Sequence, residues 1–262
     1  MKSSVLMCEP KFFSIEYEIN PWMNSANDVN HDIALNQWNN LVQTYNDLGV
    51  EVKLIEPNNK VPDLVFTANA GLIQGNTFFP SNFRFKERRP ERKLFIDWFK
   101  KHNYNIVDLP KETYFEGAGD GLFCGKYLFL GSGFRSDRNV GELLRPYIKN
   151  VEIISLGLSN PYFYHLDTCL SPLPNGEFIY YPDAFDDESR IILKSLKGHE
   201  ISEELCINYG CNLTFVDKTL ITGYADITLK DICKKLNLKI KIVPMDEFIK
   251  SGGGTRCLTL FL

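Results

Sequence analysis

The chain has 262 residues, of which 44% are hydrophobic and 24% are charged, and its formal net charge at pH 7 is −4. This length can bury a large core, and the composition is typical of a soluble globular protein. The small negative charge gives no indication of a nucleic-acid partner. No apolar run reaches the length of a membrane span, so a membrane partner is not expected either.

The seven cysteines are odd in number and form no C-x-x-C pair. Such a set is typical of free thiols in a reducing cytoplasm and argues against a zinc site. The first ten residues have too short an apolar core for a secretory signal peptide. We therefore expect a cytoplasmic protein without a structural metal. The sequence leaves open whether the protein forms a homo-oligomer.

In chain order, β-prone runs around tight turns predict four hairpins, at residues 66–79, 119–130, 167–181 and 211–222. Apolar residues at helical spacing predict helices before, between and after them, at residues 30–48, 86–102, 139–149, 186–197 and 227–236. Extended segments are predicted after most of these helices, at residues 52–55, 105–107, 151–154 and 240–243.

The hairpin turns recur at similar intervals along the chain. Their turn residues are Gly75, Gly125, Gly176 and Asp217, so the spacings are 50, 51 and 41 residues. A regular period in the range of about 20 to 50 residues is typical of stacked or radial repeats. The spacing therefore predicts repeated units that each contain one hairpin.

A fifth β-prone run begins at Cys257 and has no hairpin partner after it. The β-prone segment 4–8 is its natural partner, and pairing the two would close a ring without exposed edges. An open α/β sheet with accidental spacing is the alternative. In a ring, the polar residues that open the units would converge on the axis. These residues are Asn69, Asp120, Asp167, Asn212 and Cys257. Because buried polar groups need partners, their recurrence predicts a central polar site.

Cys257 follows three consecutive glycines, residues 252–254. A thiol in this position is either a small buried residue or, if it is held as a thiolate, a nucleophile. Glycines allow the backbone to bend and to approach a ligand closely. We interpret the three glycines as a flexible approach that brings the thiol to a ligand.

Titratable residues near the second and third hairpins extend this hypothesis. His165 and Asp167 are two residues apart, which predicts that they share one face of a strand. An imidazole near the thiol can shuttle protons, although a lone histidine in a strand is also a common structural residue. Glu116 and Asp120 flank glycines, and with Asp167 they predict an acidic pocket that suits a planar guanidinium cation. The alternative for Glu116 is an acceptor of backbone N–H groups in the turn.

Four motifs resemble, in order, those of the guanidino-group-modifying superfamily, which includes arginine deiminases, dimethylarginine dimethylaminohydrolases and amidinotransferases. They are Phe66-Thr-Ala-Asn-Ala-Gly71, Phe115-Glu-Gly-Ala-Gly-Asp120, His165-Leu-Asp-Thr-Cys169 and Gly252-Gly-Gly-Thr-Arg-Cys257. Segments 18–23, 86–88 and 133–136 are most similar to bacterial arginine dihydrolases. The resemblance covers nearly the whole chain. It implies an α/β fold, the five-bladed pentein propeller, with residues 1–262 as a single catalytic domain around a central active site.

The resemblance also implies a reaction without a metal or an organic cofactor. Cys257 would attack the guanidinium carbon and form a covalent S-alkylthiouronium adduct. His165 would protonate the leaving ammonia and then activate water against the adduct, while Glu116 would pair with His165. This arrangement follows the logic of a catalytic triad, in which a carboxylate orients an imidazole.

The resemblance further implies a set of substrate-binding residues for L-arginine or a related guanidine. Asp167 and Asp120 would hold the guanidinium nitrogens. Arg88 and Arg135 are similar to residues that grip the α-carboxylate, and Asn20 would line the pocket.

Asn69 separates the alternatives within the superfamily. Deiminases usually carry Asp here, whereas the dihydrolases carry the same Asn-containing motif. An amide both donates and accepts hydrogen bonds, so it can match the neutral ureido group of citrulline. We hypothesise that citrulline stays bound for a second attack, which gives ornithine, two ammonia and carbon dioxide. A single-step arginine deiminase or dimethylarginine dimethylaminohydrolase is the alternative; an amidinotransferase or a non-catalytic arginine-binding protein is less favoured.

Overall fold

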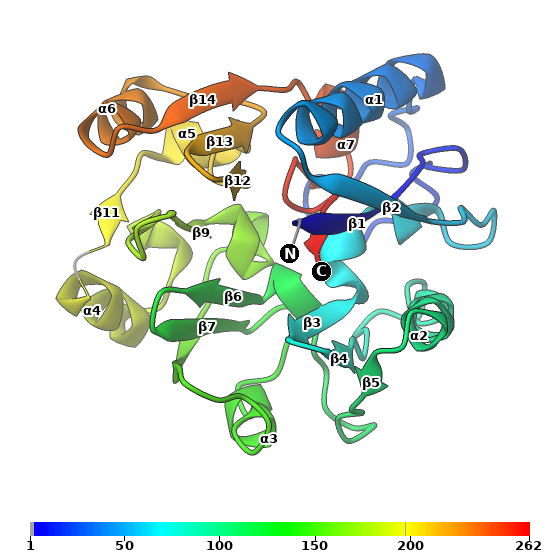
Figure 1. The fold of residues 1–262 in the computed structure, drawn as a ribbon, viewed down its shortest axis with the longest axis horizontal. Helices are drawn as coiled ribbons and strands as arrows, with labels where there is room; N and C mark the ends of the chain where they lie inside the picture. The colour runs from blue at the N-terminus through cyan, green and yellow to red at the C-terminus, as the bar shows by residue number, and fades with distance from the viewer. Residues whose placement is uncertain (1–2, 197) are drawn as a thin grey trace.

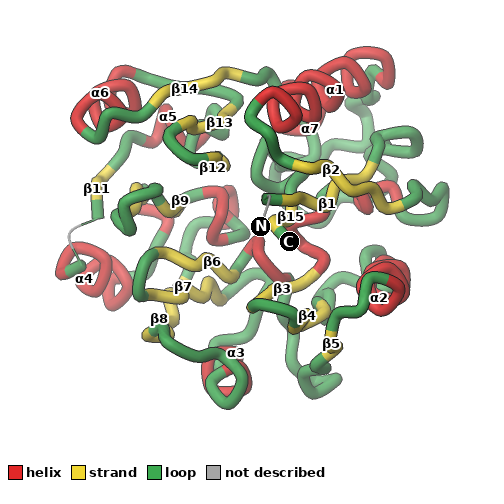
Figure 2. Tube along the Cα trace, viewed as in Figure 1, coloured by secondary structure: helices red, strands yellow, loops and turns green. Residues whose placement is uncertain are grey.

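The computed structural model describes residues 3–196 and 198–262. Five three-stranded sheets surround a central axis, and the longer helices lie at the periphery (Figure 1). The strands at the two ends of the described chain, residues 4–8 and 260–261, lie near the centre of the ring (Figure 2). The predicted five-bladed α/β propeller is therefore confirmed, and the open-sheet alternative is wrong.

Four blades share one strand order, in which an antiparallel hairpin is followed by a strand parallel to its second member. The first two of these blades contain β3 (Gly71–Gln74), β4 (Thr77–Pro80) and β5 (Asn105–Ile106), and β6 (Gly121–Cys124), β7 (Tyr127–Ser132) and β8 (Glu152–Gly157). The next two contain β9 (Leu170–Pro172), β10 (Phe178–Tyr180) and β11 (His199–Glu200), and β12 (Thr214–Val216), β13 (Thr219–Thr222) and β14 (Lys239–Ile242). The four predicted hairpins are thus confirmed.

The fifth blade joins the two ends of the chain. β15 (Leu260–Phe261) pairs antiparallel with β1 (Ser4–Cys8), so that Leu6 lies opposite Leu260. β1 in turn pairs in parallel with β2 (Glu51–Ile55). The blade therefore repeats the order of the other four, and β1 is the natural partner that the sequence predicted. Ring closure buries four of the five β1 residues, since only the first is partly exposed.

In the described part of the chain, seven α-helices lie between the strands: α1 (His31–Asp47), α2 (Glu91–Lys101), α3 (Val140–Leu144), α4 (Asp187–Ser195), α5 (Glu203–Ile207), α6 (Ile227–Lys235) and α7 (Asp246–Ile249). Five were predicted, but two are shorter than expected. Pro90 caps α2, and α3 ends just before Pro146, because proline fits the start of a helix but not its interior. Residue 197, the last of a predicted helix, lies outside the described residues. α5 and α7 were not predicted. Among the described residues, no helix is long and apolar enough to cross a membrane.

The backbone conformation at the four hairpin turns explains why glycine recurs at three of them. Gly75, Gly125 and Gly176 have positive φ values of 57°, 55° and 80°, which glycine adopts without a steric penalty. Asp217 takes the same conformation with φ of 50°, and aspartate tolerates this region better than most residues. The predicted turn positions are therefore confirmed in all four hairpins.

Short 3₁₀ turns precede three of the inner strands, and the sequence did not reveal them. They are η2 (Thr67–Ala70), η3 (Gly117–Gly119) and η5 (Leu166–Thr168). The expectation that His165 and Asp167 share one strand face is wrong, because η5 occupies this stretch and the strand begins only at Leu170. As a result, the two side chains point to different partners. The 3₁₀ turns place polar residues at the axial end where the inner strands start.

Candidate active site

The polar residues expected to converge lie at this end of the axis. Asn69, Asp120, Asp167, Asn212 and Cys257 are all at most 3% exposed. They do not form one cluster. The last three contact each other, whereas Asn69 contacts Arg88 and Asp120 supports the loop before β9.

A small cavity of about 10 Å³ lies next to Cys257. This space holds about one water molecule, so an amino acid can enter only if part of the wall moves. Four of the nine expected site residues are not in its wall, namely Glu116, Asp120, His165 and Asp167. The expected residues in the wall are Asn20, Asn69, Arg88, Arg135 and Cys257, and the others are Ile19, Met23, Asp63, Phe66, Tyr164, Ser251 and Gly252.

Asn212 holds the Cys257 thiol and its backbone. Its Nδ2 donates to Cys257 Sγ at 3.1 Å, and its Oδ1 accepts the backbone N–H groups of Arg256 and Cys257 at 3.1 and 3.2 Å. The thiol donates to Asp167 Oδ2 at 3.5 Å. The sequence placed Asn212 on the axis but gave it no role. Its contacts show that it fixes the position of the sulfur.

Burial favours the uncharged forms of Cys257 and Asp167. Burial raises the pKa of the Cys257 thiol well above its usual value, and the neighbouring Asp167 charge raises it further. Burial also raises the pKa of Asp167 to about 7, against the opposing charge of Arg256. Asp167 Oδ1 has no hydrogen-bond partner among the described residues. A cation bound here would favour the ionised forms of both groups.

The three glycines before Cys257 are tightly packed, which corrects the expectation of a flexible approach. A Cβ atom on Gly253 would lie 2.2 Å from the Phe66 ring, and one on Gly254 would lie 2.8 Å from Asn212 Oδ1. Gly252 has φ of 79° and lies against the Tyr164 hydroxyl, which donates to its carbonyl at 2.5 Å. The glycines therefore allow close packing around the thiol rather than motion.

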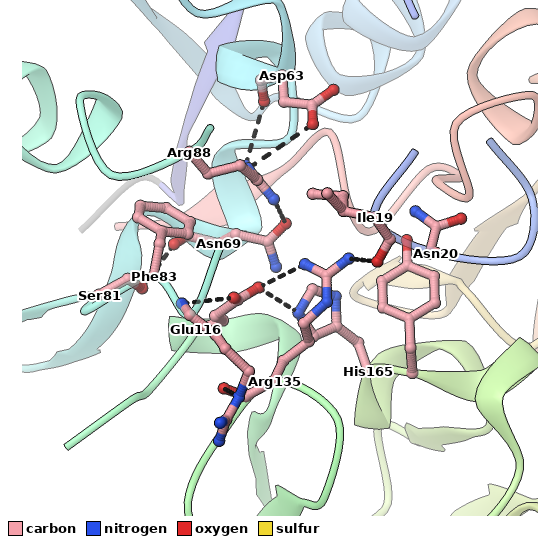
Figure 3. Close-up of polar contacts among 12 residues, drawn as sticks. Ile19, Asn20, Asp63, Asn69, Ser81, Phe83, Arg88, Glu116, Arg135 and His165 are labelled. Carbon is pink, nitrogen blue, oxygen red and sulfur yellow. Dashed lines mark hydrogen bonds and ion pairs between the residues drawn. The ribbon is translucent and has the colours of Figure 1, made fainter. Parts of the chain in front are cut away.

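His165, Glu116 and Arg135 form a second, separate group (Figure 3). Glu116 Oε2 accepts from His165 Nε2 at 2.8 Å and from Arg135 Nη1 at 2.9 Å. Burial alone would raise the pKa of Glu116, but Arg135 and His165 hold it well below its usual range. Glu116 is thus a buried carboxylate that orients the imidazole. Its contact with the backbone N–H of Arg84 at 3.3 Å also agrees with the alternative of a turn acceptor.

Arg135 also reaches the segment that covers the cavity. Its Nη2 donates to the Ile19 carbonyl at 3.0 Å, as Figure 3 shows. Its guanidinium carbon lies 4.6 Å from the Tyr164 ring centre and 4.8 Å from that of Phe85. These contacts use two of the five guanidinium N–H donors, so three remain without a partner among the described residues.

Arg88 determines the orientation of Asn69. Arg88 Nη1 donates to Asn69 Oδ1 at 2.9 Å (Figure 3). Because a guanidinium only donates, the oxygen of the amide must face it. Asn69 Nδ2 is then left buried without a hydrogen-bond partner among the described residues. A Cβ atom on Gly119 would lie 2.3 Å from this nitrogen and 3.4 Å from the His165 ring, so the unused donor is close to the imidazole.

The remaining donors of Arg88 are mostly used by acidic residues and backbone. Its Nε and Nη2 bind both oxygens of Glu91 at 2.8 Å, and Nη2 also reaches the Asp63 carbonyl at 3.2 Å. One of its five N–H donors therefore remains without a partner among the described residues. Burial raises the pKa of Glu91 to about 7, although the Arg88 charge opposes this.

Asp120 does not face the cavity, which differs from the expected guanidinium contact. Its Oδ2 accepts the Ser136 hydroxyl at 2.6 Å, and its Oδ1 accepts the Leu166 N–H at 2.9 Å. Burial raises its pKa to about 6. Asp120 therefore supports the turn that carries His165.

Asp63 is a cavity residue that the sequence analysis missed. It is 1% exposed, and its Oδ2 accepts the Tyr17 hydroxyl at 2.9 Å while Oδ1 has no partner among the described residues. Burial raises its pKa. A carboxylate inside the apolar run Val61-Pro-Asp-Leu-Val65 was the signal that could have found it. No group of His, Cys, Asp and Glu side chains in the described part of the chain could hold a metal ion.

Comparisons with known proteins agree with this geometry. The family model of eukaryotic N,N dimethylarginine dimethylhydrolase matches residues 9–262. The bifunctional arginine dihydrolase/ornithine cyclodeaminase AgrE of Nostoc sp. is 39% identical over 97% of this chain, which spans 37% of the length of that relative. A dimethylarginine dimethylaminohydrolase of Mycobacterium tuberculosis is 33% identical over 97% of this chain and 84% of its own length.

Solved structures show the same relationship. The N-terminal domain of ArgZ, a cyanobacterial arginine dihydrolase, has been solved as a cysteine-to-serine mutant bound to substrate. It matches with a TM-score of 0.94 and 36% identity over 99% of this chain and 98% of that one. An asparagine-to-serine mutant of the same domain, covalently bound to a reaction intermediate, also matches with a TM-score of 0.94. The chain therefore belongs to the family of guanidino-group-modifying enzymes that contains the dimethylarginine dimethylaminohydrolases and the arginine dihydrolases.

Proposed function

We propose that the chain is an arginine dihydrolase, which converts L-arginine and two water molecules to L-ornithine, two ammonia and carbon dioxide. The observation that supports it most is the unused Nδ2 donor of Asn69 in the wall of the cavity. A hydrogen-bond donor cannot pair with a guanidinium, because a guanidinium only donates. The Asn69 Nδ2 donor can instead pair with the carbonyl oxygen of a ureido group. The similarity to AgrE and ArgZ over nearly the whole chain supports the same reaction.

Substrate binding begins with the amino-acid end. We propose that the α-carboxylate is held by Arg135, which has three unused donors, and by the remaining Nη1 donor of Arg88. Asn20 lies in the wall beside them, where its Oδ1 accepts the N–H groups of Trp22 and Met23 and its Nδ2 donates to Ser251. Asn20 thus holds the covering segment over the bound substrate.

The guanidinium then lies against Asp167 and Cys257. Its positive charge favours the ionised Asp167 carboxylate and the Cys257 thiolate, both of which burial disfavours without a ligand. Binding of the cation therefore activates the nucleophile in the presence of substrate only. Asn212 Nδ2 donates to the sulfur and further stabilises a thiolate.

In the first cycle, Cys257 Sγ forms a bond to the guanidinium carbon. The carbon–nitrogen bond to one terminal amino group breaks, and His165 gives that group a proton so that it leaves as ammonia. His165 then removes a proton from water, which attacks the S-alkylthiouronium adduct and releases the thiolate. Glu116, a carboxylate bonded to Nε2, stabilises the imidazolium that forms in each proton transfer. The product is bound citrulline.

In the second cycle, Asn69 Nδ2 donates to the ureido oxygen and makes its carbon more electrophilic. Cys257 attacks again, a second ammonia leaves, and water hydrolyses the thiocarbamate to a carbamate, which loses carbon dioxide to give ornithine. A deiminase or a dimethylarginine dimethylaminohydrolase would stop after one attack. The covalent intermediate of the related ArgZ domain supports the covalent route.

We also propose that residues 1–262 act as one catalytic domain without a metal or organic cofactor, in the cytoplasm. All seven cysteines in the described part of the chain are free and buried, which agrees with a reducing compartment. Light scattering of the purified chain measures the oligomeric state.

Amino-acid analysis of the products of L-arginine tests the proposed reaction. We expect ornithine to form without accumulation of citrulline. The Asn69→Asp variant loses the free donor and places a carboxylate against Arg88, so its product should shift toward citrulline by about tenfold or more, because a lost hydrogen bond of this kind is worth about 1–3 kcal/mol. Citrulline as the sole stoichiometric product of the unmodified protein would instead show a deiminase.

A further inference from the structure

A second cavity, of about 240 Å³, lies on the axis beyond the active site. All five inner strands contribute to it, and they do so with residues further along each strand than the polar residues of the active site. One wall residue from each blade and one cation define it: Ile73, Phe123, Pro172, Phe215, Phe261 and Arg256. We call this cavity the apolar funnel, because its wall is mainly hydrophobic.

Among the described residues, Arg256 is the one charged side chain in the wall of the funnel. Its backbone N–H donates to Asn212 Oδ1, which fixes its position next to Cys257. Its guanidinium makes no hydrogen bond or ion pair with any residue in 3–196 or 198–262, and its Nε is buried without a partner. Burial lowers the pKa of Arg256, although the charge of Asp167 opposes this.

Arg256 is half-buried, and its Nε has lost water without gaining a partner among the described residues, which is unfavourable for a charged donor. Two arginines near the axis that are fully buried contrast with it. Arg88 forms a bidentate pair with Glu91, and Arg135 pairs with Glu116. A ligand with a matching acceptor would satisfy Arg256, since a carboxylate accepts two parallel N–H bonds from a guanidinium.

We propose that the apolar funnel is a second binding site, for a small carboxylate with an apolar or aromatic body. The carboxylate would pair with Arg256, and the body would contact Ile73, Phe123 and Phe215. The volume is below the range of about 300–1,000 Å³ typical of drug-sized ligands, which favours a small compound. This binding does not depend on the proposed reaction.

Occupation of the funnel also affects the active site. The positive charge of Arg256 helps to keep Asp167 ionised, because it lowers the pKa of that carboxyl. A bound anion neutralises Arg256 and so favours protonated Asp167. Asp167 then attracts a guanidinium less strongly, and the carboxylate ligand weakens arginine binding through charge alone.

Calorimetric titration with 3-phenylpropionate tests the site, with 3-phenylpropionamide as a neutral probe of the same shape. We expect the acid to bind at least tenfold more tightly than the amide. Arg256→Met should remove the difference. The matched variant Arg135→Gln, which removes a buried guanidinium from the other end of the axis, should retain it. Equal binding of acid and amide, or full acid binding by Arg256→Met, would contradict the proposal.

A crystal of the unmodified protein soaked in 3-phenylpropionate decides the matter if either variant does not fold. Density for the acid at Arg256 supports the proposal, whereas density only at Arg135, or none, overturns it. The coupling has a separate readout in the KM for arginine. The acid should raise this KM severalfold and the amide should not. An unchanged KM with the acid bound at Arg256 overturns the coupling and leaves the proposed reaction untouched.

Discussion

The two ends of the central axis treat buried charge in opposite ways. At the end where the inner strands begin, Arg88 and Arg135 each pair with a buried glutamate, and their remaining contacts fix Asn69 and the covering segment. At the other end, Arg256 lies in an apolar wall and has no ion-pair partner in the described part of the chain. Arginine is thus held by an internal ion pair at one end and has no ion-pair partner among the described residues at the other.

The difference shows how to recognise a ligand contact in a ligand-free structure. A charge paired within the protein positions its neighbours, and it can bind a ligand only through the donors that the pair leaves free, as proposed for Arg135 and Arg88. A buried group with an unused donor or acceptor marks the place where a ligand completes the structure. Among residues that line the two cavities or contact Cys257, this criterion selects Asn69 Nδ2, Asp63 Oδ1, Ser251 Oγ, Asp167 Oδ1 and Arg256 Nε.

The largest expected effect is at the nucleophile. Cys257→Ala should reduce arginine turnover by about 10⁴-fold or more, because no other group can form the covalent adduct. Cys124→Ala is the matched control, since this thiol is also buried but bonds the carbonyls of Gly176 and Glu177 in a hairpin. Its turnover should be nearly normal. Substantial activity in Cys257→Ala would move the nucleophile elsewhere.

The next largest effect is expected at Glu116, which orients His165 but does not itself attack the substrate. Glu116→Gln keeps the shape of the side chain but removes the charge that stabilises a His165 imidazolium. We expect kcat to fall by about 10²- to 10⁴-fold with a smaller change in KM. Steady-state kinetics over a range of pH measure both constants. A rise in KM alone would indicate that Glu116 serves substrate binding through Arg135 instead.

Stability measurements compare the two kinds of arginine directly. Arg135→Met leaves Glu116 buried without its main counter-charge, so the free energy of unfolding should fall by about 3–5 kcal/mol. Arg256→Met removes a half-buried guanidinium that has no ion-pair partner among the described residues, so it should be neutral or stabilising. Urea unfolding of both variants provides the comparison. If Arg256→Met is as destabilising as Arg135→Met, the guanidinium has a partner and the contrast fails.

The smallest effect concerns pH. The pKa of Asp167 is about 7 without a ligand, and a guanidinium binds the ionised form. Arginine affinity should therefore rise by up to about tenfold per pH unit below pH 7 and level off above it. The inactive Cys257→Ser variant keeps a donor to Asp167 and allows calorimetry without turnover. In the same background, Asp167→Asn should bind more weakly at neutral pH and lose this pH dependence.

Much of the fold was predictable from the sequence, because it is encoded locally. The turn residues Gly75, Gly125, Gly176 and Asp217 set the repeat, and the unpaired run after Cys257 indicated how the ring closes. Helix ends were less predictable where proline allowed either a turn or a helix start.

The candidate site was predictable as a set of residues but not as a geometry. The order of motifs suggested His165, Glu116 and Cys257, yet 3₁₀ turns rather than strands direct His165 and Asp167 to separate partners. The apolar run around Asp63 indicated a buried carboxylate, but its partner Tyr17 and the contacts of Asn212 come from segments far apart in the chain, so no local pattern shows them. The tight packing of the three glycines likewise depends on a distant ring, that of Phe66.

Single-turnover kinetics with the enzyme in excess over L-arginine test the central claim most directly. Under this condition each arginine passes through one active site, so the ammonia released counts the attacks by Cys257. We predict two ammonia and one ornithine per arginine, with no citrulline released. One ammonia per arginine, with citrulline in equal amount, would contradict the second attack and the role of Asn69.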